Sequence, residues 1–410
     1  MPSAAATAGR AQRAPWPRLS TLAGEVGGAE VHGEALVEGV TEDSHAVVPG
    51  MLFCAVRGAR VDGHTCAERA VERGAAALLV ERWLDLDVPQ LRVPNTRAAL
   101  GPVAAAVYGR PSAALRTVGV TGTNGKTTVT WALAEAFAAA GWAPGLIGTI
   151  ETRVVDRRQR AALTTPQPSE LQATLATMAA EGVEALAMEV SSQALDQCRV
   201  DGICFDVAVF LGMAPEHLDY HGTMAHYYAS KAALFDPARA TLGVVRVDDE
   251  WGRRLAHQAA IPVTTFGTSP EAQVRVEEVS TGLWGTRCRL RGGPDGTVEL
   301  ASPLIGAYNA TNLAATYLAA RLLGVGRDEA VAGIGACEPV PGRFQPVDRG
   351  QPFLVVVDFA HTPDAMAVAV DTARSLVAPG GRVHVVFGCA GERDRLKRPT
   401  MGRAAARADR

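Results

Sequence analysis

The stretch that most constrains the fold of this chain runs from Thr117 to Ala140. It begins with a short run, Thr117–Thr121, that is typical of a buried strand, continues through a loop rich in glycine and asparagine, and ends in an alanine-rich helical segment, Thr127–Ala140. Glycines in such a loop let backbone N–H groups close around an anion, and the start of the helix adds partial positive charge. The pattern therefore predicts a phosphate-binding loop within an α/β fold.

The residues of this loop suit the phosphates of ATP. Lys126 can neutralise the β- and γ-phosphates, and the hydroxyl of Thr127 can complete the shell of a magnesium ion. The common spacing of such loops places a first glycine at position 120, where this chain has Val120, so the loop is a variant. The structural alternative, a tight turn with an incidental lysine, is disfavoured by the flanking strand and helix. We therefore expect ATP to bind at Gly122, Thr123, Asn124, Gly125, Lys126, Thr127 and Thr128.

Short strand-like runs alternate with helical segments along most of the chain, which favours a mostly parallel sheet covered on both faces. The runs lie at residues 35–40, 51–56, 76–80, 90–93, 185–190, 207–210, 242–247 and 262–266. After a Gly/Pro-rich break at 338–343, we expect strands at 353–359 and 382–387 and a helix at 363–377. This last unit is short for a domain and ends without a further strand, so we expect the chain to be truncated at its C-terminus.

Composition excludes several classes of protein. With 410 residues, 48% of them hydrophobic and 20% charged, the chain has the profile of a soluble globular protein. A formal net charge of −3 argues against a dedicated nucleic-acid binder. The seven cysteines are scattered and never spaced as Cys-x-x-Cys, which fits a reducing compartment better than a disulfide framework or a structural zinc site. No segment approaches the roughly 20 apolar residues that span a bilayer. We therefore expect a cytoplasmic protein that binds neither nucleic acid nor membrane.

Lysine is rare in this chain. Only Lys126, Lys231 and Lys397 are lysines among the 40 basic residues. Because an ammonium is a compact charge whose pKa shifts readily, a lysine retained in an arginine-rich chain suggests that its chemistry matters. The alternative is coding bias with three survivors by chance.

The loop sequence Gly-Thr-Asn-Gly-Lys-Thr-Thr at 122–128 resembles the ATP loop of the Mur ligases, which build the peptide stem of peptidoglycan. Motifs further along the chain, in the same order as in that family, resemble those of the UDP-N-acetylmuramoyl-tripeptide synthetases. The resemblance implies three domains: a UDP-MurNAc-binding α/β domain at 20–110, a central ATP-binding domain at 111–338 and an incomplete Rossmann-like amino-acid-binding domain at 339–410. It also implies a monomer that uses ATP and magnesium to add meso-diaminopimelate or L-lysine to UDP-MurNAc-L-Ala-D-Glu through an acyl phosphate. The arginine- and alanine-rich composition, typical of a high-GC bacterium, favours meso-diaminopimelate.

The same resemblance assigns roles to individual residues. Those matched to catalysis are Lys126, Glu189, His217 and Lys231, the last as a carbamylated lysine. Those matched to magnesium are Thr127, Glu189, His217 and Lys231. Further ATP contacts are implied at Asn309, Asn312, Arg343 and Asp358. Substrate contacts are implied at Ser44, Thr164, Thr165, Ser191, Gln197, Arg199 and Arg393. Their chemistry is suitable, because hydroxyls and amides match sugar and peptide groups and a guanidinium grips a carboxylate through two bonds.

The chain departs from the family pattern at several points. Gln193 stands where the family has a histidine, His45 where an arginine is common, and Leu211-Gly212-Met213 where Thr-Asn-Leu is usual. The motif that reads the third amino acid is absent from the sequence. Two alternatives therefore stay open: a diverged Mur-like ligase that couples other substrates, and a non-catalytic remnant that binds a nucleotide.

Overall fold

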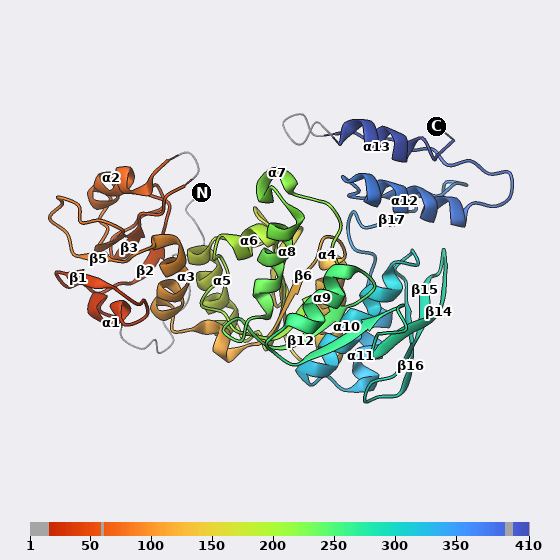
Figure 1. Cartoon of the computed structure of the whole chain (residues 1–410), viewed down its shortest axis with the longest axis horizontal. Coiled ribbons are helices and arrows are strands. Elements are labelled where there is room, and N and C mark those ends of the chain that lie inside the picture. The colour runs from red at the N-terminus through yellow and green to blue at the C-terminus, as the bar shows by residue number, and fades with distance from the viewer. Residues whose placement is uncertain (1–15, 59–60, 390–396, 410) are drawn as a thin grey trace. The chain divides into compact units, whose positions relative to one another are not determined.

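The computed structural model describes residues 16–58, 61–389 and 397–409 (Figure 1). The chain forms two compact units, each assembled from separate stretches of sequence. The first unit takes the described residues of Met1–Gly119, Ala143–Asp206 and Ala233–Thr241, and the second takes those of Val120–Trp142, Val207–Ala232 and Leu242–Arg410. Strand β6 (Arg116–Thr121) crosses this division, so the loop that follows it belongs to the second unit.

A five-stranded sheet with the order β1-β5-β4-β3-β2 begins the first unit. Its strands are β1 (Glu30–His32), β2 (Gly39–Thr41), β3 (Met51–Cys54), β4 (Ala77–Val80) and β5 (Gln90–Arg92), and only β1 runs antiparallel to its neighbour. Because side chains alternate along a strand, Leu52 and Cys54 join one apolar cluster and Phe53 joins the other. Figure 1 shows the helices that cover these faces, α1 (Leu19–Ala23) and α3 (Thr96–Val107) on one side and α2 (Ala67–Glu72) on the other.

A second group of strands in this unit has the order β6-β10-β7-β8-β9. These are β10 (Ala185–Glu189) and β7 (Pro144–Ile147), which pair in parallel, and β8 (Glu151–Val154) and β9 (Arg157–Arg160), which extend the sheet as an antiparallel meander. Helix α5 (Pro168–Ala180) buries Leu171, Leu175 and Met178, whose spacing of three to four residues puts them on one face. The short helix α6 (Ser192–Asp196) follows β10 directly.

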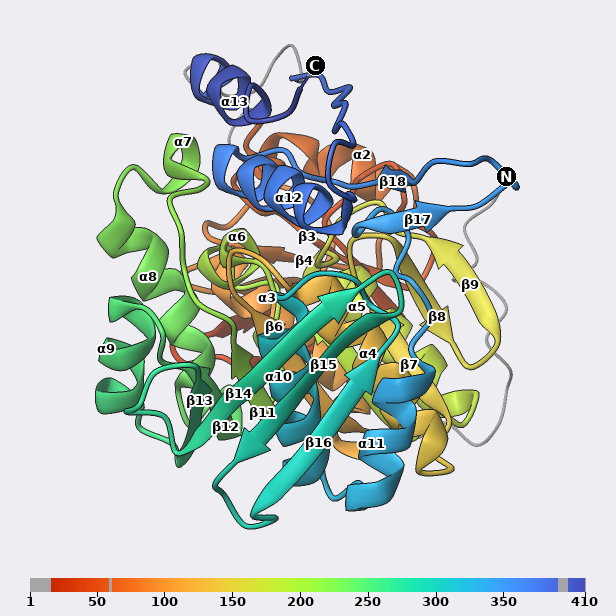
Figure 2. The ribbon, with the colours of Figure 1, turned by 90° about the vertical axis from the view of Figure 1, so that its right-hand side faces the viewer.

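The second unit carries the strand order β16-β15-β14-β13-β12-β11-β6. The strands are β11 (Phe205–Phe210), β12 (Ala240–Arg246), β13 (Val263–Gly267), β14 (Val274–Gly282), β15 (Gly285–Arg291) and β16 (Thr297–Ser302). Figure 2 shows β14, β15 and β16 as a long antiparallel ribbon with α10 (Asn309–Leu323) and α11 (Arg327–Ala336) packed behind it. Both helices also contact α4 (Lys126–Ala139). Helix α11 approaches α4 closely, because a Cβ on Gly333 would lie 2.4 Å from Cα of Ala136.

Helices α7 (Leu218–His221), α8 (Met224–Ala232) and α9 (Glu250–Gln258) complete the central part of this unit. Towards the C-terminus follow the two-stranded pair β17 (Gln345–Val347) and β18 (Val355–Val357) and the helices α12 (Pro363–Leu376) and α13 (Arg398–Ala405).

The predicted α/β fold class is confirmed, and α4 and α12 begin and end within one residue of the helices expected at 127–140 and 363–377. The strand expected at 382–387 is wrong, since these residues form no strand. A strand is held by hydrogen bonds to a neighbouring strand, and an apolar run alone does not provide that neighbour. The antiparallel ribbon β14–β16 was not predicted, because its alternating pattern gives no sign of where it joins a parallel sheet.

Candidate active site

The loop between β6 and α4 adopts a conformation that only glycine tolerates at two positions. Gly122 has φ of +146° and Gly125 has φ of +89°. A Cβ on Gly125 would lie 2.5 Å from Oδ1 of Asn312, and one on Gly122 would lie 2.8 Å from Cβ of Leu211. Gly125 is also the N-cap of α4 and has no side chain to cap it, so the first-turn N–H groups of the helix suit an anion.

Lys126 bends back across this loop. Its ammonium donates hydrogen bonds to the carbonyl oxygens of Gly122 (2.8 Å) and Thr123 (2.9 Å). Thr127, which is almost fully buried, accepts a hydrogen bond at Oγ1 from Nη2 of Arg343 (2.9 Å). Two of the cations expected to meet phosphate groups are therefore gathered at the start of α4.

Lys231 lies on α8 with only 1% of its surface exposed. Its Nζ donates to the carbonyl oxygen of Gly122 at 2.9 Å and lies 4.7 Å from the ring centre of Tyr227. Burial and the nearby positive charge of Lys126 hold the pKa of Lys231 well below its ordinary range, while Glu216 acts in the opposite direction. This lowering of the pKa favours the uncharged amine, which is the form that reacts with carbon dioxide.

His217 precedes α7 in a left-handed conformation, with φ of +55°. Burial lowers the pKa of His217, although the neighbouring Glu216 partly counters this, and the neutral imidazole is the form that binds a metal ion. Burial would raise the pKa of Glu216, but the hydrogen bond from His361 and the charges of Lys126 and His217 hold it at about 2. His361 Nε2 lies 3.0 Å from Oε1 of Glu216.

The two asparagines predicted to contact ATP are hydrogen-bonded to each other on α10. Nδ2 of Asn312 donates to Oδ1 of Asn309 at 2.9 Å, and Nδ2 of Asn309 donates to the carbonyl oxygen of Ile305 at 2.9 Å. Asp358 accepts backbone hydrogen bonds from Phe344 (2.7 Å) and Ala360 (2.8 Å). The asparagines therefore hold the start of α10 to Ile305, and Asp358 holds the backbone at Phe344 and Ala360.

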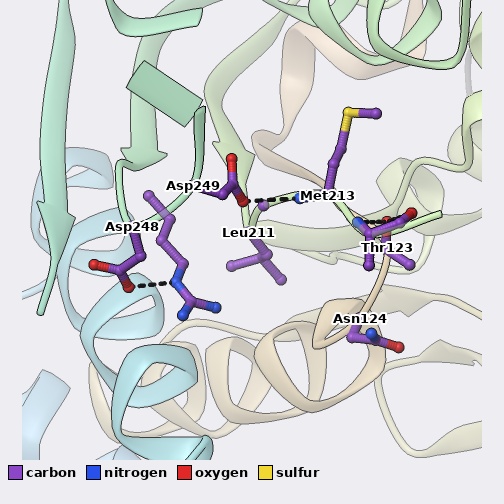
Figure 3. A pocket seen from close by; sticks show the side chains of 9 residues that line it. Thr123, Asn124, Leu211, Met213, Asp248 and Asp249 are labelled. Carbon is purple, nitrogen blue, oxygen red and sulfur yellow. Dashed lines mark hydrogen bonds and ion pairs between the residues drawn. The ribbon is translucent and has the colours of Figure 1, made fainter. Parts of the chain in front are cut away.

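A cavity of about 270 Å³ lies beside the loop (Figure 3). It is lined by Thr123, Asn124, Leu211, Gly212, Met213, Ala214, Arg246, Asp248 and Asp249. Asp249 accepts the backbone N–H of Met213 at 3.0 Å and that of Gly252 at 2.7 Å, so it connects the start of α9 to the segment after β11. A Cβ on Gly212 would lie 2.5 Å from Oδ2 of Asp249, so only glycine leaves room for this carboxylate.

The first unit gathers a separate cluster around Glu189, the last residue of β10, which has 1% of its surface exposed. Thr149 holds both of its carboxylate oxygens: the backbone N–H donates to Oε1 (2.8 Å) and the hydroxyl donates to Oε2 (3.0 Å). Sequence reasoning missed Thr149, although its place just after a parallel strand, β7, could have singled it out.

Several predicted substrate residues belong to the same cluster. Thr164 lies with its Oγ1 at 3.1 Å from that of Thr149. Thr165 is buried, donates to the carbonyl oxygen of Glu189 (2.9 Å) and accepts the N–H of Ser191 (3.1 Å). Arg199 donates to Oε1 of Gln197 from Nε (3.1 Å) and from Nη2 (2.7 Å), and to the carbonyl oxygen of Thr165. Thr165 thus supports the cluster from within.

Two further predicted contacts stand apart from it. Ser44 is buried in the loop after β2 and accepts hydrogen bonds at Oγ from Nε (3.2 Å) and Nη2 (2.7 Å) of Arg69, which sequence reasoning did not single out. Arg393 lies outside the described residues.

Comparison with known proteins decides the family. Three family profiles match in order: "Mur ligase family, catalytic domain" at 36–108, "Mur ligase middle domain" at 120–320 and "Mur ligase, glutamate ligase domain" at 342–410. The chain belongs to the Mur ligase family. It is 42% identical over 396 residues to a UDP-N-acetylmuramoyl-L-alanyl-D-glutamate-2,6-diaminopimelate ligase of Streptomyces avermitilis, with 95% of this chain and 78% of that protein covered. It is also 42% identical over 399 residues to the protein of the same name from Geobacillus thermodenitrificans, with 95% and 81% covered.

Solved structures agree. A structure of a UDP-N-acetylmuramoyl-L-alanyl-D-glutamate-2,6-diaminopimelate ligase superposes with a TM-score of 0.74 at 30% identity, covering 91% of this Mur ligase and 77% of that chain. MurF from Acinetobacter baumannii superposes with a TM-score of 0.63 at 21% identity, covering 88% and 76%, and shows the same fold. The expected C-terminal truncation is not borne out by the shares of these relatives that the chain covers, 78% and 81%. Among the described residues, no helix is both long enough and apolar enough to cross a bilayer.

Proposed function

We propose that this Mur ligase adds meso-diaminopimelate to UDP-N-acetylmuramoyl-L-alanyl-D-glutamate at the expense of ATP. The single observation that carries the proposal is the convergence of Lys126 and Lys231 on the Gly122 carbonyl of a glycine loop that opens a helix. The names of the relatives supply the substrates. A diverged ligase with other substrates is the second candidate, favoured by Leu211 and Gly212 at the cavity wall.

The reaction follows from the chemistry of a carboxylate, which is a poor acyl donor. The D-glutamyl side-chain carboxylate attacks the γ-phosphorus of ATP, the bond to the bridging oxygen breaks, and ADP leaves with an acyl phosphate formed. The amine of the third amino acid then attacks the acyl carbon, loses a proton and expels inorganic phosphate as the amide forms. Lys126 and Arg343 would offset the negative charge of the transferring phosphoryl group, since such catalysis consists mainly of positioning and electrostatics.

Magnesium fits the donors that this chain offers. Within the second unit, Thr127 offers a buried hydroxyl and His217 an imidazole whose lowered pKa favours the neutral form. Within the first unit, Glu189 offers a buried carboxylate. The ion would neutralise phosphate charge. Lys231 is proposed to carry a carbamate: its uncharged amine adds to carbon dioxide, loses a proton and becomes a carboxylate-like ligand, consistent with its buried, desolvated environment.

We further propose the domain division 20–110, 111–338 and 339–410, with substrate held through Ser44, Thr164, Thr165, Ser191, Gln197, Arg199 and Arg393. The protein would act as a cytoplasmic monomer. Closure of the last domain would exclude water from the acyl phosphate, and the bond between Arg343 and Thr127 is the contact that such closure would use.

The test is release of inorganic phosphate from ATP in the presence of UDP-MurNAc-L-Ala-D-Glu and meso-diaminopimelate. We expect release that requires both acceptor and amine, and a loss of at least about 100-fold in Lys126→Met. Arg403→Met, which removes an exposed cation of α13 that donates to Oγ1 of Thr400, is the matched control and should retain activity. Release by Lys126→Met at the rate of the unaltered protein would refute the mechanism. Release that needs neither substrate would refute the assignment of substrates.

A further inference from the structure

The carboxylate of Glu189 is held at both oxygens by one residue, Thr149. The backbone N–H of Thr149 lies 2.8 Å from Oε1, and its hydroxyl lies 3.0 Å from Oε2. Gly148 makes this approach possible, because a Cβ at that position would lie 2.4 Å from Oε1 of Glu189. The orientation of this predicted magnesium ligand is therefore set by the turn between β7 and β8.

The hydroxyl of Thr149 also meets that of Thr164 at 3.1 Å, and the direction of this hydrogen bond can be worked out. A hydroxyl has one proton to donate. An ionised carboxylate, the form that binds a metal ion, only accepts, so the proton of Thr149 is committed to Oε2 of Glu189. Thr149 must then accept from Thr164, and the chain of donation runs from Thr164 through Thr149 to Glu189.

The direction of these hydrogen bonds determines what Thr164 can offer to a substrate. Since the proton of Thr164 is committed to Thr149, Thr164 presents only lone pairs to a molecule placed against it. Thr164 is partly exposed, whereas Glu189 at the other end of the chain is buried. A substrate group that meets Thr164 must therefore donate, as an amide N–H or a hydroxyl does. A substrate carboxylate would meet lone pairs and be repelled.

We propose that Thr149 is a positioning residue that fixes the orientation of the Glu189 carboxylate, which would hold a magnesium ion, and that, through the direction of the hydrogen bonds, it makes Thr164 an acceptor for an N–H or O–H group of the substrate. This inference rests on the proposed function. It links Thr149, to which neither the motifs nor the family resemblance gave a role, with Glu189 and Thr164, to which the resemblance did.

The experiment compares Thr149→Val, which keeps shape and the backbone N–H but removes the hydroxyl, with Thr149→Ser, which restores it. Thr177→Val, which removes a threonine hydroxyl bonded within α5, is the matched control. Two affinities are measured by calorimetry: that of Mg²⁺ for the ADP-bound protein, and that of UDP-MurNAc-L-Ala-D-Glu without metal. We expect Thr149→Val to weaken Mg²⁺ binding about 10-fold, as loss of a ligand's hydrogen-bond partner does. Substrate binding should weaken roughly 3- to 10-fold.

Thr149→Ser should recover both affinities, and Thr177→Val should change neither. Thr164→Val should weaken substrate binding, and adding Thr149→Val to it should weaken it little further, because the two hydroxyls act through one chain. A Thr149→Val protein with a lowered melting temperature but unchanged affinities would overturn the proposal. Weakened Mg²⁺ binding with full substrate affinity would overturn the role given to Thr164. Failure of the unaltered protein to bind UDP-MurNAc-L-Ala-D-Glu would instead overturn the proposed function, and the Mg²⁺ measurement would still test Thr149.

Discussion

Replacement of Gly125 by alanine tests whether the loop geometry, more than the charge of Lys126 alone, creates the nucleotide site. The added Cβ would sit at φ of +89° and lie 2.5 Å from Oδ1 of Asn312 and 3.0 Å from Cδ1 of Leu211. A left-handed conformation costs an L-residue about 1–2 kcal/mol. Moving Asn312 would also strain the hydrogen bond from its Nδ2 to Asn309, which contributes about 1 kcal/mol.

We therefore expect Gly125→Ala to lose about 2–3 kcal/mol of unfolding free energy if the loop keeps its shape. If the loop changes shape instead, less stability is lost but nucleotide affinity falls. Gly141→Ala is the matched control: Gly141 has φ of +78°, lies just after α4, and a Cβ there would meet nothing within 4 Å. It should show only the conformational cost and should bind ATP normally.

The assay is urea unfolding together with calorimetric titration of a non-hydrolysable ATP analogue. Gly125→Ala should cost less stability in an Asn312→Ala background than in the unaltered protein, because the clash at Oδ1 is then absent. The reasoning is refuted if Gly125→Ala binds the nucleotide as tightly as the unaltered protein and loses no more stability than Gly141→Ala.

Two further predictions concern pH. Burial and Lys126 lower the pKa of Lys231 in the folded state. Between that lowered pKa and the ordinary lysine pKa of about 10, the unfolded chain holds a proton that the folded chain lacks, so stability rises with pH across this window. Lys231→Met should flatten this rise in melting temperature, measured without bicarbonate, and abolish ligase activity; an unchanged slope would contradict it. Asp62 has a pKa lowered to about 2, chiefly by the hydrogen bond from the N–H of His64. This stabilisation is present above about pH 4 and is lost as the pH falls through 2. Above pH 4, Asp62→Asn should therefore lower the free energy of unfolding, measured in urea, by less than about 1 kcal/mol, because the group is partly exposed. This difference should vanish near pH 2.

Local sequence accounted well for the strand, loop and helix from β6 to α4. The signals there act over a few residues. Gly122 and Gly125 stand where φ is positive, Asn124 lies between them, Lys126 follows them, and the alanines of α4 favour a helix. The same reasoning placed α12. It failed at 382–387, where the residues have strand-like character but form no strand.

Candidate site residues divide in the same way. Lys126 and Thr127 follow from the loop itself, while Glu189, His217 and Lys231 were named through resemblance to the family. Thr165 stays a predicted substrate contact, and the structure adds that it is buried and donates to the Glu189 carbonyl. The sequence could not show this bond, because it depends on which way the side chain turns.

The sequence by itself determined that the chain has a nucleotide loop, a strand–helix alternation and a family. Tertiary structure decided what surrounds those features: Arg343 reaches Thr127 across 216 positions of the chain, Lys231 reaches Gly122 across 109, and Thr149 grips Glu189 across 40. The physical reason is range. Turn and helix signals act over a few residues. The altered pKa of Lys231 comes from burial and from the charge of Lys126, and the orientation of Glu189 comes from hydrogen bonds of 2.8 and 3.0 Å to Thr149, and only folding provides these surroundings.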